Sequence, residues 1–147
     1  MGSRITTHNL DGTISVSDTR TIDDARAEAA QRLEGHFAAL IVAGRNYAGH
    51  NYQIDDASRA NINAAATMAM VAPDAWSGDF YWIASDNSHV PMTAAEVIAF
   101  GLNAGDYYTA MIFTNRAHKD AIAALTTIST CDAYDVIAGW PANDAGA

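Results

Sequence analysis

Apolar residues repeat every three or four positions in two long stretches of the first half of the chain, a spacing that places them on one face of a helix. The first stretch follows Thr21, which can cap it, and predicts a helix that ends at about 37–39. The second stretch predicts a helix over 57–71, because two aspartates can cap its start and Pro73 stops it.

The second half of the chain predicts one long helix and one short helix. Thr93–Glu96 forms a capping box, in which the threonine and glutamate side chains each bond an unpaired amide, and no proline follows it up to Leu125. A helix of about 30 residues would be about 45 Å long. That exceeds what a domain of this size covers, so we expect part of it to pack on another molecule. Ser129 or Thr130 is expected to cap a last helix that ends at Ile137.

Three hairpins are expected between these helices. The first covers 4–16, where a two-residue Asp-Gly connection favours a tight turn. The second turns at Gly49 and includes a strand at 40–42. The third covers 79–92 and is rich in aromatic residues that favour strands. Because a lone two-stranded hairpin is marginal in water, we expect the first one to lie on the protein body or on a neighbour.

These elements predict an α+β fold with three to four helices and short antiparallel β-hairpins. The chain has 147 residues, half of them apolar, which suffices for one compact domain. We divide it into an N-terminal hairpin arm over 1–20, a single α+β domain over 21–141 and a frayed tail over 142–147.

Charge and composition narrow the range of partners. The formal net charge is −9, and the eight basic residues are scattered, so neither nucleic acid nor an anionic membrane is an expected partner. The start of the chain lacks the pattern of a signal peptide, and the longest apolar run, 37–43, is too short to cross a bilayer. A soluble protein is expected, and the single Cys131 fits a reducing cytoplasm.

No set of residues predicts chemistry. The acid pairs Asp23-Asp24 and Asp55-Asp56 fall at helix starts, where capping explains them. Cys131 has no cysteine companion, and although a triad assembled in space stays open, we expect this residue to be structural. We therefore expect no catalytic, cofactor-binding or metal-binding residue, no cofactor and no enzymatic activity. The histidines show no pair at the i, i+4 spacing of zinc ligands; they are His8, His36, His50, His89 and His118.

Aromatic residues in the third hairpin allow two interpretations. Alternation along a strand places Phe80 and Trp82 on one face and Tyr81 on the other. We prefer the interpretation in which Phe80 and Trp82 pack against the long third helix. Stacking on a sugar or a base, as in a carbohydrate binder or a small hydrolase, stays open.

Three blocks of sequence resemble an uncharacterised domain family of bacteriophage tail-fibre and tail-assembly proteins. The blocks are Asn51–Arg59, Phe80–Ile98 and Ile137–Pro141, in matching order and spacing. The resemblance extends from about Ala25 to Pro141 and leaves out the hairpin arm. It brings no catalytic residues and implies a protein that is made in the host cytoplasm and located in the virion tail.

The resemblance implies a structural component of a tail tip, baseplate or tail fibre that binds other phage tail proteins. The alternative is a tail-fibre assembly chaperone that is absent from the mature virion. Tail fibres usually have threefold symmetry, so we expect a homo-oligomer and favour a trimer. A monomer whose long helix breaks near 101–105 stays open. The candidate interface residues come from the first hairpin and from the long helix: Ile5, Ile14, Val16, Gly101, Ala104 and Tyr108.

Overall fold

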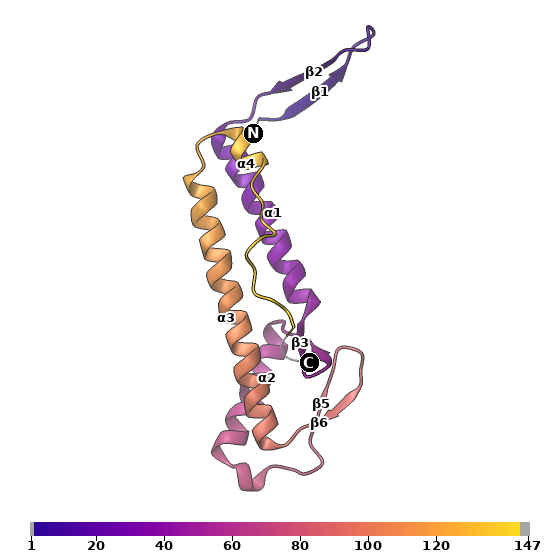
Figure 1. Ribbon diagram of the computed structural model, residues 1–147, viewed down its shortest axis with the longest axis vertical. Coiled ribbons are helices and arrows are strands. Elements are labelled where there is room, and N and C mark those ends of the chain that lie inside the picture. Colours follow the sequence, from indigo (N-terminus) through magenta and orange to yellow (C-terminus); the bar gives the residue numbers. More distant parts are fainter. Residues whose placement is uncertain (1, 145–147) are drawn as a thin grey trace. The chain divides into compact units, whose positions relative to one another are not determined.

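A computed structural model describes residues 2–144 and shows an α+β fold of helices and two-stranded antiparallel hairpins (Figure 1). The elements follow one another as β1 (Arg4–His8), β2 (Ile14–Asp18), α1 (Ile22–Ala43), β3 (Arg45–Tyr47), β4 (His50–Tyr52), α2 (Asp56–Val71), the short 3-10 helix η1 (Pro73–Ala75), β5 (Tyr81–Ile83), β6 (His89–Pro91), α3 (Ala94–Ala124) and α4 (Ile128–Asp132). Each strand pairs with its neighbour in the sequence, so the fold class predicted from the sequence is confirmed.

The chain divides into two compact units. The first comprises the residues up to His36 together with Asn115–Ala138, and the second comprises Phe37–Thr114 and the segment from Gly139 onward. Both α1 and α3 run from one unit into the other. This division differs from the predicted one over 1–20, 21–141 and 142–147, because contacts between distant segments, and not the order along the chain, define the units.

The second unit has an aromatic core around Phe100 of α3. The ring centroid of Phe100 lies 4.5 Å from that of Tyr52 and 5.6 Å from that of Trp82. Phe80 also packs against this core, whereas Tyr81 is exposed and stacks on His89. The predicted packing against the third helix is therefore confirmed for Trp82, and Phe80 packs beside it in the same core.

The first unit joins the start of α1 to the end of α3 and to α4. On α1, Ala25, Ala29 and Leu33 are fully buried. Two arginines of the same helix bond backbone carbonyl groups of the other elements. Arg26 donates to the carbonyl oxygen of Leu125 at 2.7 and 3.0 Å, and Arg32 donates to that of Cys131 at 2.7 Å. These bonds cap the ends of α3 and α4.

The strand predicted at 40–42 is wrong, because these residues are the last part of α1. Leu40 and Ile41 continue the helical face of Phe37. The three residues pack together in a second apolar cluster, which belongs to the second unit. The helix ends at Gly44, whose φ of 74° is in the left-handed region. A Cβ atom there would lie 2.5 Å from the carbonyl oxygen of Tyr52. Both the positive φ and this clash therefore disfavour a side chain at position 44.

The last helix is shorter than predicted and has a different cap. It begins after Thr127, whose hydroxyl accepts a hydrogen bond from the Thr130 amide, and it ends at Asp132 instead of Ile137. Further along, Asp135 accepts the Ile137 amide at 2.8 Å. Such a local bond from an aspartate side chain favours a turn over a helix.

The first hairpin forms as predicted but with a longer connection. β1 ends at His8 and β2 begins at Ile14, so five residues connect the strands instead of Asp11-Gly12 alone. The amide of Asn9 bonds the Thr13 carbonyl at 2.9 Å, and Gly12 has a φ of 81°. This arrangement is typical of a loop that ends in a left-handed glycine.

The segment after Gly139 is held against the second unit where fraying was expected. Trp140 stacks on Phe37 with ring centroids 5.8 Å apart. Asn143 accepts the Asn46 amide at 3.0 Å and donates to the Gly44 carbonyl at 3.0 Å. The expected fraying is therefore wrong at Asn143, and its remainder at 145–147 lies outside the described residues.

Candidate interaction site

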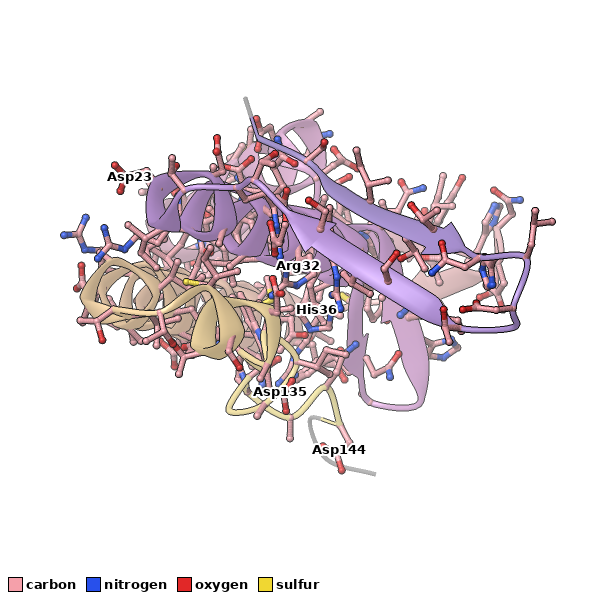
Figure 2. All side chains as sticks on the ribbon, turned by 90° about the horizontal axis from the view of Figure 1, so that it is seen from above. Asp23, Arg32, His36, Asp135 and Asp144 are labelled. Carbon is pink, nitrogen blue, oxygen red and sulfur yellow. The ribbon has the colours of Figure 1, made fainter. Side chains whose placement is uncertain are left out.

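The β1–β2 hairpin is exposed along its whole length, and Figure 2 shows its side chains as sticks along the two strands. In its register, Ile14 pairs with His8 and Val16 with Thr6, so both apolar side chains lie on one face. Ile5 lies on the other face. The exposed fractions are 54% for Ile5, 61% for Ile14 and 53% for Val16. The three hairpin residues predicted for an interface are thus accessible to a partner.

Arg20 anchors the hairpin to the first unit. Its guanidinium donates to Asp18 at the end of β2, to Glu28 on α1 and, through two bonds of 2.8 and 2.9 Å, to Asp132 at the end of α4. The side chain of Arg20 is 5% exposed, so these bonds are largely screened from water. The end of β2 is therefore bonded to α1 and α4 through Arg20, while the strands themselves are exposed.

The Arg20 guanidinium also shifts the pKa of two carboxylates that it bonds. Hydrogen bonds from Arg20 lower the pKa of Asp18 from 3.8 to about 2 and lower the pKa of Asp132. In turn, the three carboxylates raise the pKa of Arg20, mainly through the bonds to Asp18 and Asp132. Arg20, Asp18 and Asp132 therefore stay charged over the physiological pH range.

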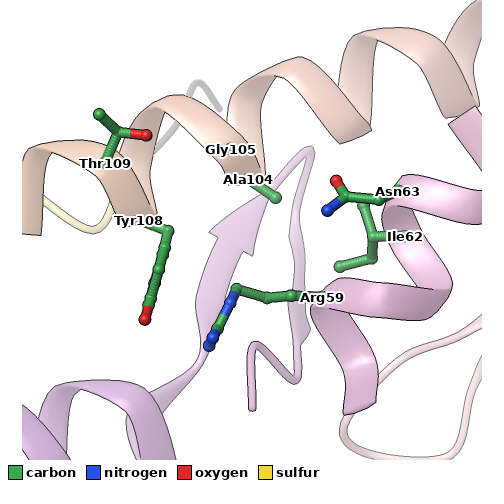
Figure 3. A pocket seen from close by; sticks show the side chains of 7 residues that line it. All are labelled: Arg59, Ile62, Asn63, Ala104, Gly105, Tyr108 and Thr109. Atoms are coloured by element: carbon green, nitrogen blue, oxygen red, sulfur yellow. The ribbon is translucent and has the colours of Figure 1, made fainter. Parts of the chain in front are cut away.

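A cavity of about 270 Å³ lies between α2 and α3 in the second unit (Figure 3). Tyr108 and Ala104 line it from α3, and Arg59 lines it from α2. The Arg59 guanidinium lies over the Tyr108 ring, 3.7 Å from its centroid, and bonds Asp56 and the Ile54 carbonyl at 2.6 Å each. The charge of Arg59 is thus balanced within the helix, and a ligand here would meet a mainly apolar wall.

Gly101 and Ala104 do not offer the open surface that the sequence suggested. Ala104 is 3% exposed, and a Cβ atom on Gly101 would lie 2.8 Å from the Cβ atom of Ala66. These small residues let α2 approach α3 within the same chain. The helix also continues without a break through Gly105, so the alternative of a helix that breaks near 101–105 is wrong.

Arg45 is a second buried arginine, in the second unit, and it has a different environment. Its guanidinium lies over the Tyr107 ring at 4.2 Å, and its Nε donates to Asn103 at 2.9 Å. A further bond of 2.9 Å goes to the Ala142 carbonyl. Burial lowers the pKa of Arg45 and raises that of Tyr107. The contacts serve to hold the segment around Asn143 in place.

One member of each acid pair acts as a helix cap, as predicted. Asp55 accepts the Ser58 amide at 2.9 Å, and Asp24 accepts the Thr21 amide at 2.9 Å. Backbone hydrogen bonds are the main cause of the lowered pKa of each. Asp23 instead pairs with Arg26 of the next turn, and its side chain points into solvent (Figure 2). Asp24 and Asp55 therefore serve as caps, and Asp23 and Asp56 each pair with an arginine three residues later.

His118 and Cys131 both lie in structural surroundings. His118 lies between the Tyr134 hydroxyl at 2.8 Å and the Ala138 carbonyl at 3.0 Å. Because a carbonyl only accepts, Nε2 of His118 carries the proton toward Ala138. Cys131 is fully buried at α4. Within residues 2–144, no three His, Cys, Asp or Glu side chains are placed to hold a metal ion.

A comparison with family models identifies the domain. The family described as Domain of unknown function (DUF4376) matches residues 18–138, which is most of the chain. The chain belongs to this family. No curated protein and no solved structure matches the chain. The DUF4376 match begins at the last residue of β2, so the exposed hairpin lies almost entirely outside the shared domain.

Sequence reasoning missed Arg20 and Arg45 of this DUF4376 domain. Both look like ordinary surface arginines in the sequence, and the partner Asp132 is 112 positions from Arg20. A weak signal was present, because Asp18 lies two residues before Arg20 and Glu28 lies two helical turns after it.

None of the helices among the described residues combines the length and apolar character that crossing a membrane requires.

Proposed function

We propose that this chain is a structural component of a bacteriophage tail, in the tail tip, baseplate or tail fibre, and that it acts through protein–protein interfaces without catalysis. The β1–β2 hairpin carries this proposal. A two-stranded hairpin that is exposed on both faces is marginal in water, and this one presents three exposed branched apolar side chains. Its anchoring by Arg20 keeps it in a defined position for a partner.

Two further observations support the proposal. The hairpin precedes the part of the chain that matches the family, as expected for a segment that attaches a shared domain to its particular neighbour. The three sequence blocks that resemble phage tail proteins fall within the folded body, at β4 and the start of α2, at the β5–β6 hairpin and the start of α3, and around Trp140. In this proposal the partners are other tail proteins and further copies of this chain, with a trimer favoured.

Mass spectrometry of purified particles of the phage that encodes this chain tests the proposal. We expect the protein at a copy number comparable to that of known tail components. Its presence in infected cells together with its absence from particles would favour the assembly chaperone instead. As a control, a chain lacking residues 2–17 should fold but fail to enter particles, since the hairpin is the attachment element.

A further inference from the structure

The closing segment, which we define as Trp140–Asn143, lies on the second unit without forming a helix or a strand. Three of its groups make contacts there: the Trp140 ring, the Ala142 carbonyl and the Asn143 side chain. Their partners in these contacts lie within 37–111. The segment is therefore bound, like a ligand, by a surface that comes from a distant part of the sequence.

The Trp140 ring is the apolar anchor of the closing segment. It stacks on Phe37 with ring centroids 5.8 Å apart. It also packs against a cluster of buried residues: Ile54, Tyr107 and Met111. Large aromatic side chains bury much apolar area and are therefore common anchors of interfaces. This part of the surface selects a large aromatic side chain.

The Asn143 side chain bonds the edge of β3 as a neighbouring strand would. Its oxygen accepts the Asn46 amide at 3.0 Å, and its nitrogen donates to the Gly44 carbonyl at 3.0 Å. In a parallel sheet, one residue bonds two backbone groups of its neighbour in the same way, through its own carbonyl and amide. A carboxylate of the same size could accept the amide but could not donate to the carbonyl. The β3 edge therefore selects asparagine.

Arg45 binds the backbone of the closing segment and is positioned without it. Its Nε atom donates to Asn103 at 2.9 Å, and its guanidinium lies over the Tyr107 ring at 4.2 Å. A further bond of 2.9 Å goes to the Ala142 carbonyl. Arg45 is 7% exposed, and among the described residues it forms no ion pair with a carboxylate. A hydrogen bond from a charged donor is roughly twice as strong as a neutral one, so a carbonyl presented here is bound firmly.

We propose that this surface is a peptide-recognition site, which the closing segment fills in the free chain. The partner is a short segment of another protein that presents an aromatic side chain and, three residues later, an asparagine. Bonds to the edge of a sheet, together with pockets for side chains, are a recurring mode of peptide binding. The net charge of −9 disfavours a second copy as the source of the segment, so we assign the segment to a different protein.

Two features allow a partner to replace the closing segment. The site is preformed, because Asn103, Tyr107 and the β3–β4 pairing hold it in place, and a preformed site loses little freedom on binding. All four residues of the closing segment are exposed or half-buried, so the segment can leave without opening the core.

This site is independent of the phage-tail proposal, because it does not include the β1–β2 hairpin. If the chain is a phage tail component, the partner is another tail protein. Failure of the peptide experiment would leave the particle experiment on the hairpin unaffected.

A labelled synthetic peptide with the sequence of 138–144 tests the site in the full chain. Both of its ends are blocked, so that no free carboxylate is offered to Arg45. In a double variant, Trp140→Ala with Asn143→Leu, the closing segment loses two anchors, and the peptide should bind with a dissociation constant of about 100 µM or tighter. In the wild type, the short tether keeps the closing segment at an effective concentration of about 1 mM, so the peptide should bind at least about tenfold more weakly. Fluorescence anisotropy measures both.

Substitutions in the peptide and in the site provide the controls. The peptide with Asn143→Leu should bind at least about tenfold more weakly to the double variant, because two hydrogen bonds are lost. Arg45→Met, added to the double variant, should weaken binding similarly. Ile137→Ala, at an exposed residue before the closing segment, is the matched control and should behave as the wild type.

Circular dichroism verifies that the double variant is folded. Asn143→Leu alone, which keeps the Trp140 anchor, is the milder variant and should also bind the peptide more tightly than the wild type does. A folded variant that does not bind the peptide, or that binds both peptides equally, would overturn the proposal.

Light scattering identifies the source of the segment. The double variant should have the same mass as the wild type, whatever number of 15.6 kDa chains the wild type contains. A lower mass for the double variant would show that copies exchange their closing segments, and the assignment to another protein would then be wrong.

Discussion

Arg20 and Arg45 are both buried, yet their charges are balanced differently. Arg20 bonds three carboxylates, from β2, α1 and the end of α4. Arg45 instead bonds an amide side chain and a backbone carbonyl and lies over the Tyr107 ring. Because an unpaired buried charge is costly, the stability of the first unit depends on the ionisation of the acids around Arg20.

The bonds between Arg20 and Asp18 predict that the stability of the protein decreases in acid. The pKa of Asp18 is lowered from 3.8 to about 2, so the stabilisation that depends on its charge is complete above pH 3.8 and is lost as the pH falls through about 2. Arg20→Ala should therefore flatten the decrease in the urea midpoint between about pH 4 and pH 2. Arg116→Ala, which removes an exposed pair with Asp120, should leave that decrease unchanged. Equal curves for Arg20→Ala and the wild type would contradict this interpretation.

Among the elements, α3 shows how neighbouring helices decide the effect of a glycine. Gly101 and Gly105 lie one turn apart in the same helix. A Cβ atom on Gly105 would meet no atom within 4 Å, whereas one on Gly101 would lie 2.8 Å from Ala66 of α2. Helix propensity favours alanine at both positions, so contact with α2 is the difference between them.

Alanine substitutions at the two glycines should consequently have different effects on stability. Gly105→Ala should raise the free energy of unfolding by about 0.5–1 kcal/mol, the usual gain in a helix interior. Gly101→Ala should show no gain or a loss, because α2 must shift to admit the methyl group. Urea unfolding of both variants provides the measurement, and an equal gain at the two positions would show that α2 does not pack closely on Gly101.

The β1–β2 hairpin is an element whose removal should separate folding from assembly. All ten strand residues are exposed, and the buried residues of the first unit lie elsewhere. Deletion of 2–17 keeps Asp18 and Arg20, so the thermal midpoint should change by at most a few degrees. Circular dichroism on heating measures this. A large drop in the midpoint would place the hairpin within the folding core of its own chain.

At the scale of the whole molecule, no metal is expected to contribute to folding. Within residues 2–144, no group of three His, Cys, Asp or Glu side chains is placed to hold a metal ion. Addition of EDTA should leave the thermal midpoint of the purified protein unchanged. A decrease of several degrees would indicate a metal site that includes residues outside the described part of the chain.

Much of the local structure was predictable because it depends on neighbouring residues. The capping box at Thr93 and the cap at Asp55 place two helix starts, and the Glu96 carboxylate accepts the Thr93 amide at 2.8 Å. The predicted strand at 40–42 failed for a related reason. A short run of branched residues suits a strand or a buried helix, and the helix-ending Gly44 comes only after it.

The sequence by itself determined the fold class, the starts of the first three helices and the face of β5 that turns inward, since these follow from spacing and capping over a few residues. The tertiary structure alone decided which surfaces remain free. It places Gly101 and Ala104 against α2 and leaves Met68 and Val71 exposed. It also brings Asp132 to Arg20 across 112 positions of sequence. Such contacts depend on how distant segments pack, and local spacing carries no information about which segments meet.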